Sequence, residues 1–162
     1  MKKPTLLVYV ILFLFTLIGC SEATQPKTEA EPELLAGYIV LVDNTLKFDE
    51  VEIVEEEDKD RMSELGLSDT DMPNGYAIIN QNKEEVIFEL TDEVEYTFTD
   101  LDLYFVTDAE GNRLYTTTKK DEFIKHLGAL NTFPLSEQKI PYFIEVRDGK
   151  VIKITEKFEF TM

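Results

Sequence analysis

Residues 68–76, Ser-Asp-Thr-Asp-Met-Pro-Asn-Gly-Tyr, come closest to the spacing of a ligand site. Asp69 and Asp71 are two residues apart, like the first two oxygen ligands of a calcium loop. The pattern then departs from an EF-hand, because Pro73 stands where an oxygen ligand is needed and Asn74 stands where glycine is needed. We therefore expect a turn leading into a strand. Asp69, Asp71 and Asn74 remain the candidate cation or ligand loop, with Ca²⁺ as its ion.

The densest run of charge lies just before this loop. Its carboxylates are Glu50, Glu52, Glu55, Glu56, Glu57, Asp58 and Asp60. Alternation along a strand places Glu50 and Glu52 on one face and Val51 and Ile53 on the other, so part of the run is expected to be the solvated side of a sheet. A dedicated metal site would need ligands that converge from several segments.

Nucleophilic chemistry has few candidates in this chain. The single histidine, His126, lies at the border of an apolar helical stripe, where we expect a boundary residue. No Gly-x-Ser-x-Gly sequence occurs, and no glycine precedes a Lys-Ser or Lys-Thr pair. Asp and Glu are abundant, and because of this abundance any chosen pair of carboxylates is uninformative as a catalytic signal. The sequence therefore favours a binding protein over an enzyme.

Composition narrows the class of protein further. The 162 residues include 33 acidic and 16 basic side chains, one His and one Cys, with a net charge of −17. A single Cys excludes an internal disulfide and a Cys-rich metal site. The negative charge argues against a nucleic-acid partner, because phosphate backbones are bound mainly by Lys and Arg. We predict no cofactor, with Ca²⁺ as the alternative.

The N-terminus has a different character from the rest of the chain. Two lysines precede the apolar residues 6–18, and this run is shorter than the roughly 20 residues that cross a bilayer. It ends in Leu17-Ile18-Gly19-Cys20, which resembles the lipobox of bacterial lipoproteins at all four positions. The resemblance implies a diacylglyceryl thioether on Cys20, with acyl chains such as palmitate, and cleavage before that residue.

The expected organisation follows from these signals. Residues 1–19 form the lipoprotein signal peptide, and residues 20–33 form the lipidated Cys and a flexible acidic tether with little apolar surface to bury. Residues 34–162 form a single β-rich domain. Two acyl chains give stable anchoring, and the resemblance to bacterial lipoproteins implies that the anchor lies on the extracytoplasmic face of the cell membrane.

The domain shows a period of two, which is typical of strands. Asp43-Asn44 is expected to form a two-residue turn that pairs Leu41 with Leu46 and Ile39 with Phe48. For the C-terminal hairpin we expect a three-residue loop, residues 147–149, that pairs Ile144 with Ile152 and Tyr142 with Ile154.

Two helices interrupt the strands. Asp58 is expected to cap the first and Gly66 to end it in left-handed conformation. Thr118 is expected to cap the second. The apolar stripe of the second helix is Phe123, Ile124, Leu127 and Leu130. The predicted fold is α+β and predominantly antiparallel, a small partly open barrel of OB-like or related type with two helices.

Two stretches, residues 71–76 and 141–156, resemble parts of small uncharacterised lipoproteins of Gram-positive bacteria. The resemblance implies a location but no reaction. We predict a lipid-anchored extracytoplasmic binding or accessory module, attached to the membrane through Cys20 and suited by its charge to a cationic protein or peptide. The alternatives are a divalent-cation-binding surface lipoprotein and, third, a carboxylate-based hydrolase of the envelope.

Overall fold

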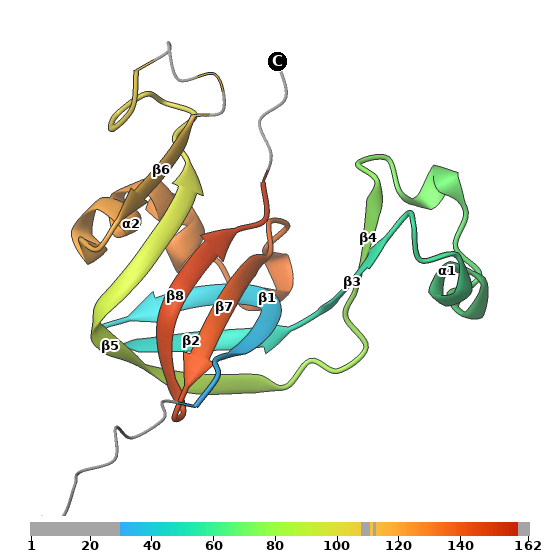
Figure 1. Ribbon diagram of the computed structural model, residues 1–162, viewed down its shortest axis with the longest axis horizontal. Helices are drawn as coiled ribbons and strands as arrows, with labels where there is room; N and C mark the ends of the chain where they lie inside the picture. Colours follow the sequence, from blue (N-terminus) through green and yellow to red (C-terminus); the bar gives the residue numbers. More distant parts are fainter. Residues whose placement is uncertain (1–29, 108–110, 112, 159–162) are drawn as a thin grey trace, which may run out of the picture.

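The computed structural model describes residues 30–107, 111 and 113–158 of the chain (Figure 1). Its strands are β1 (Glu33–Val42), β2 (Thr45–Glu50), β3 (Glu52–Glu55), β4 (Tyr76–Ile79), β5 (Glu85–Thr99), β6 (Leu114–Thr117), β7 (Tyr142–Arg147) and β8 (Lys150–Glu156). Its helices are α1 (Lys59–Leu65) and α2 (Lys120–Leu127), with short 3₁₀ turns η1 (Asp69–Asp71), η2 (Gly128–Thr132) and η3 (Leu135–Glu137).

Five strands close into a barrel. Their order is β2, β1, β7, β8 and β5, and β5 pairs back onto β2. All of these pairings are antiparallel except that of β5 with β8, which is parallel. The third barrel strand therefore lies beside the fifth, which is the connectivity of an OB barrel. The prediction of a small, mainly antiparallel α+β barrel with two helices is confirmed.

One edge of β1 shows how the barrel is completed. β7 pairs with β1 only over residues 33–37. Beyond that point the Gln138 side chain accepts a hydrogen bond from Ile39 N (3.2 Å) and donates one to Ile39 O (2.6 Å). Asn131 does the same at Leu41, with distances of 2.7 and 3.1 Å. Two side-chain amides thus replace a partner strand along this part of β1.

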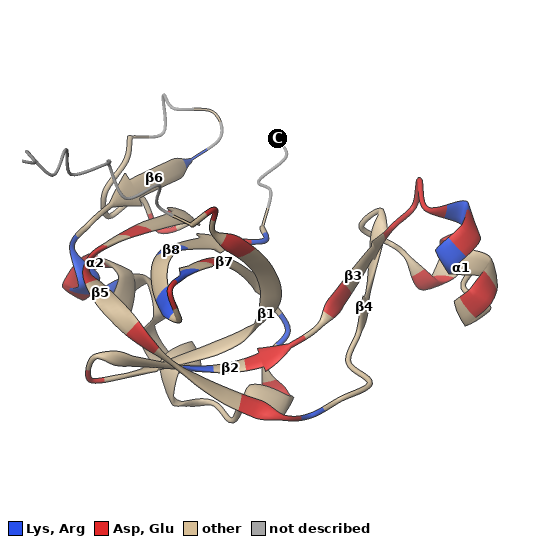
Figure 2. Cartoon of the chain, turned by 60° about the horizontal axis from the view of Figure 1, so that its bottom comes forward, with Lys and Arg blue, Asp and Glu red and all other residues tan. Residues whose placement is uncertain are grey.

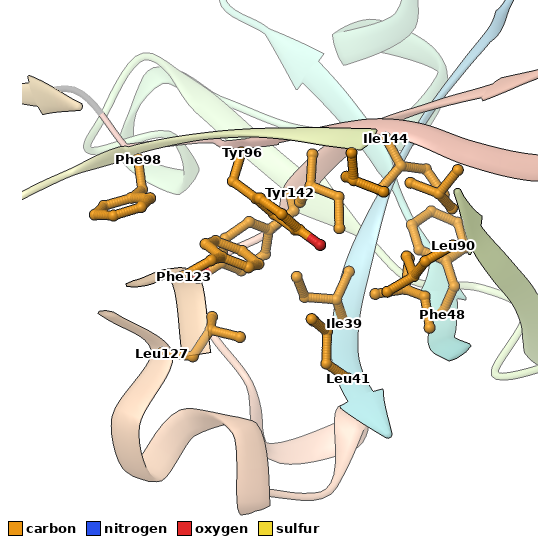
Figure 3. Packing of buried hydrophobic residues seen from close by; sticks show 14 of the residues in the cluster. Ile39, Leu41, Phe48, Leu90, Tyr96, Phe98, Phe123, Leu127, Tyr142 and Ile144 are labelled. Carbon is orange, nitrogen blue, oxygen red and sulfur yellow. The ribbon is translucent and has the colours of Figure 1, made fainter. Parts of the chain in front are cut away.

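The barrel interior holds the main core (Figure 3). The strands contribute alternate residues such as Ile39 and Leu41, as expected when one strand face is buried. From α2, Phe123 and Leu127 point toward this core, and the Phe123 ring stacks on that of Tyr96 with 4.7 Å between centroids. The helix therefore covers one side of the barrel core.

The two predicted hairpins had different outcomes. The β1–β2 register is confirmed, with Leu41 opposite Leu46 and Ile39 opposite Phe48. The prediction of a three-residue loop before β8 was wrong, because β7 and β8 are joined by a two-residue turn, residues 148–149. The predicted pairs were wrong as well, since Ile144 lies opposite Ile154 and Tyr142 opposite Glu156. A bulge between the Glu145–Lys153 and Val146–Val151 pairs adds one residue to β8. This bulge restores the alignment of apolar faces that the longer loop was meant to supply.

The helix predictions were right for α1 and partly wrong for α2. Asp58 accepts a hydrogen bond from Arg61 N (3.1 Å), and Gly66 has a φ of 66°. The residue that precedes α2 as its cap is Lys119, not Thr118. Two residues of the predicted stripe are exposed: Ile124 on α2, and Leu130, which lies in η2 beyond the end of the helix. The barrel thus contacts a narrower and shorter face of α2 than the spacing suggested.

Candidate binding site between the arm and the barrel

Residues 52–79, which comprise β3, α1, η1 and β4, form an arm that projects from the barrel (Figure 1). The arm links β2 to β5, two neighbouring barrel strands. It has its own small core, in which Val54, Met62, Met72 and Ala77 are buried. Its sequence contains nine acidic and two basic residues, a net charge of −7. The arm is therefore an ordered, strongly negative addition to the barrel, as the red segments in Figure 2 show.

Both basic residues of the arm pair with its own carboxylates. Arg61 donates to both oxygens of Glu52, with distances of 2.7 and 2.8 Å, and to Glu64 at 2.8 Å. Hydrogen bonding to Arg61 lowers the pKa of Glu52. Lys59 lies 3.8 Å from Asp69. These pairs connect α1 to β3 and to η1, and they use the local positive charge to hold the arm together.

A cavity of about 510 Å³ lies where the arm meets the end of β8. Its lining consists of the carboxylate run Glu55–Glu57, the turn formed by residues 73–76, Lys157 and Phe158. Ligand cavities are typically about 300–1,000 Å³. This cavity is of ligand-binding size, and three neighbouring glutamates supply negative charge to its lining.

The ammonium group of Lys157 already lies in this cavity. Its Nζ is 3.1 Å from Glu55 Oε1 and 5.0 Å from the centroid of the Tyr76 ring. The side chain of Lys157 is 18% exposed, and its backbone N–H donates to Pro141 O at 2.9 Å. A carboxylate together with an aromatic face is a favourable environment for a cation. The site can therefore bind an ammonium group.

The structure separates the three residues of the predicted ligand loop. Asn74 lines the cavity, whereas Asp69 and Asp71 lie on η1, outside its lining. Asp71 Oδ2 accepts hydrogen bonds from Ser68 N (2.9 Å) and Ser68 Oγ (2.6 Å), which lower the pKa of Asp71. Asp71 thus has a local structural role in the turn.

The acidic run at residues 50–60 has several roles. Glu50 and Glu52 are exposed while Val51 is buried, as alternation predicted. The next part of the run lines the cavity, and Asp58 caps α1. Within the described ranges 30–107, 111 and 113–158, no group of three or more His, Cys, Asp or Glu residues is arranged to hold a metal ion.

His126 belongs to a second polar cluster, on the barrel. Its Nε2 lies 3.1 Å from Glu156 Oε1, and its ring stacks on Phe98 with 4.1 Å between centroids. The other oxygen of Glu156 accepts a hydrogen bond from Thr99 N at 2.9 Å. Burial, and then the charge of Glu156, raise the pKa of Tyr142. The cluster ties α2 to the end of β8.

The tyrosines of the described barrel strands and loops lie in different environments. Tyr96 and Tyr142 are buried, while Tyr104 is 60% exposed. Asp100, itself buried, accepts hydrogen bonds from the backbone N–H groups of residues 104–106 and so fixes this loop. Lys125 lies 4.0 Å from the centroid of the Tyr104 ring.

Sequence reasoning identified the glutamates of the cavity but not their partner. Lys157 and Glu55 are 102 residues apart, and no local pattern links the end of β8 to the arm. Tyr76 ends the stretch 68–76, but the predicted ligand loop gave it no role. Cys20 and the rest of the lipobox fall outside the residues that the structure describes.

Comparison with protein-family models, with curated proteins and with solved structures gives no match. Among the described helices there is none with the length and hydropathy that a bilayer crossing requires.

Proposed function

We propose that this chain is a lipid-anchored extracytoplasmic binding module that captures a cationic segment of a protein or peptide on its acidic arm. The observation that carries the proposal is the cavity of about 510 Å³ in which the Glu55 carboxylate and the Tyr76 ring lie next to the Lys157 ammonium group. Because the arm has a net charge of −7, it attracts cationic partners within a Debye length of about 8 Å at physiological salt.

The form of the barrel supports a role for the arm. OB barrels commonly bind ligands on the face of their second and third strands and with the loops that join the first to the second and the fourth to the fifth strand. Here both of those loops are two-residue turns, residues 43–44 and 148–149. The long addition is instead the arm, which connects the second and third barrel strands. The elaborated part of this barrel is thus also strongly acidic.

The lipid anchor in this proposal rests on the sequence Leu17-Ile18-Gly19-Cys20. It is tested by expressing Cys20→Ser in a lipoprotein-processing bacterium and measuring the membrane fraction. We expect the variant to leave the membrane fraction or to keep its signal peptide. Unchanged retention of a processed protein would contradict lipid anchoring without touching the role of the arm.

Capture by the arm is tested with a dye-labelled, capped octalysine peptide and the full chain in a non-ionic detergent at 0.15 M salt. The arm variant carries Glu55→Gln, Glu56→Gln and Glu57→Gln. The matched control removes three exposed charges of β5 by Glu89→Gln, Asp92→Asn and Glu93→Gln. Three exposed charge interactions of about 0.2–1 kcal/mol each predict a loss of about tenfold in affinity for the arm variant.

The control variant distinguishes capture by the arm from non-specific charge attraction. Both triple variants have the same net charge, so non-specific attraction predicts equal affinities. We expect the control to change affinity less than threefold. Equal losses in the two variants would refute capture by the arm.

A further inference from the structure

Lys157 is the residue directly after β8, and it reaches the cavity from a different part of the fold than the arm that supplies the glutamates. Its Nζ is 3.1 Å from Glu55 Oε1, 5.0 Å from the Tyr76 ring centroid and 5.9 Å from the Phe143 ring centroid. One ammonium therefore meets a carboxylate and two aromatic rings. This arrangement matches the way in which a protein binds the side chain of a foreign lysine.

The contacts of Lys157 are of a kind that another cation can replace. The Glu55 carboxylate is 46% exposed, so solvent and solutes reach it. Glu56 and Glu57 line the same cavity, so its carboxylates outnumber the one ammonium seated there. The Lys157 side chain has a flexible four-carbon stem, and the backbone N–H of Lys157 is held separately by its hydrogen bond to Pro141 O. The ammonium can leave by side-chain rotation while β8 stays in place.

We propose that Lys157 acts as an internal ligand of this cavity, and that the partner's own lysine ammonium displaces it. This inference rests on the proposed function and deepens it in two respects. It identifies the recognised group as a primary ammonium on a flexible stem, and it makes Lys157 a competitor that lowers the affinity of the arm. The cationic segment is thus held by Glu55 and Tyr76 in place of Lys157.

The first test compares Lys157→Gln with Lys150→Gln, using octalysine and the full chain at 0.15 M salt. Both substitutions remove one positive charge, and Lys150 pairs with Glu89 at 3.0 Å on the barrel. A half-buried ion pair and a cation–π contact together predict about fivefold higher affinity for Lys157→Gln. We expect less than a twofold rise for Lys150→Gln. Equal rises, or a lower affinity for Lys157→Gln, would overturn the inference.

A second measurement uses the unmodified chain and so does not depend on how a variant folds. The rate of lysine acetylation by a dilute reagent is followed residue by residue, with and without saturating octalysine. Displacement predicts that acetylation of Lys157 becomes faster relative to that of Lys150 when the peptide is bound; this ratio cancels the reagent consumed by the peptide's own lysines. An unchanged or lower ratio would overturn the inference.

The aromatic contribution is tested by Tyr76→Leu, for which we expect about threefold weaker binding of octalysine. Unchanged affinity would show that the ring does not bind the ammonium and would overturn that part of the inference. These results are separable from the proposed function. If neutralising Glu55–Glu57 weakens binding while the Lys157 tests fail, the arm captures the peptide and Lys157 is no competitor.

Discussion

The hydrogen bonds from Gln138 to β1 give the sharpest stability prediction. Gln138 is buried, and its amide satisfies both the N–H and the C=O of Ile39, at 3.2 and 2.6 Å. Gln138→Ala leaves these two buried backbone groups without that partner. A buried group left unpaired costs about 1–3 kcal/mol. Because water can reach part of the space created, we expect a loss of about 3 kcal/mol, a large share of the roughly 5–15 kcal/mol typical of a domain.

The assay is equilibrium unfolding in urea, followed by circular dichroism, with three variants. Gln138→Met keeps most of the side-chain volume but cannot bond to Ile39, so it isolates the hydrogen bonds from packing. We expect it to lose at least about 2 kcal/mol. Glu137→Ala changes an exposed neighbour and should stay within about 0.5 kcal/mol of the wild type. A Gln138→Met variant as stable as the wild type would refute the view that this amide completes the barrel edge.

Three further predictions concern other parts of the chain. A Cβ added at Gly37 would lie 2.5 Å from Asp49 O and 2.6 Å from the buried Phe48 ring. Gly37→Ala should therefore lower the free energy of unfolding in urea by about 1–3 kcal/mol. An unchanged free energy of unfolding would contradict this close approach. Hydrogen bonds from Lys119, Thr117 and Tyr115 lower the pKa of Glu122 from its ordinary 4.5 to about 2. The lowered pKa means that Glu122 stabilises the fold above about pH 4.5 and that this contribution is lost as the pH falls toward 2. Glu122→Gln should therefore flatten the fall in stability between pH 5 and 2, and equal slopes for variant and wild type would count against it. Asp71 already accepts hydrogen bonds from Ser68, so we expect no calcium site at this loop. Ca²⁺ should then shift the melting temperature equally, and without saturation, in the wild type and in the double variant Asp69→Asn, Asp71→Asn. A saturable stabilisation of the wild type that is lost in the double variant would instead establish the calcium loop.

Most of the barrel strands could be predicted from the sequence because strand alternation is a local signal. The buried Ile39 and Leu41 and their partners across the Asp43-Asn44 turn follow directly from a period of two. The same reasoning failed at the second hairpin, where a bulge in β8 changes the count of residues. A bulge has no local signature in that stretch, so the register could not be derived from alternation alone.

The candidate site was only half visible in the sequence. The run Glu55–Glu57 stands out in the sequence by its charge, and the preceding Glu50 and Glu52 were predicted to lie on a solvated sheet face. Its connection with Lys157 depends on where the barrel places the end of β8 relative to the arm. Likewise, the amide of Gln138 reaches Ile39 across 99 positions of the chain. Contacts of this kind are set by tertiary structure, and residue spacing does not encode them.

The central claim, that the cavity between the arm and the barrel binds a cationic segment, is tested most directly by an amide NMR titration of the full chain with octalysine. We predict that the amides of residues 55–57, 74–76 and 157–158 shift first and saturate together. The exposed acidic residues of β5, such as Glu89 and Glu93, serve as the internal comparison. Shifts spread over all acidic surfaces in proportion to charge, or confined to the barrel away from the arm, would contradict the claim.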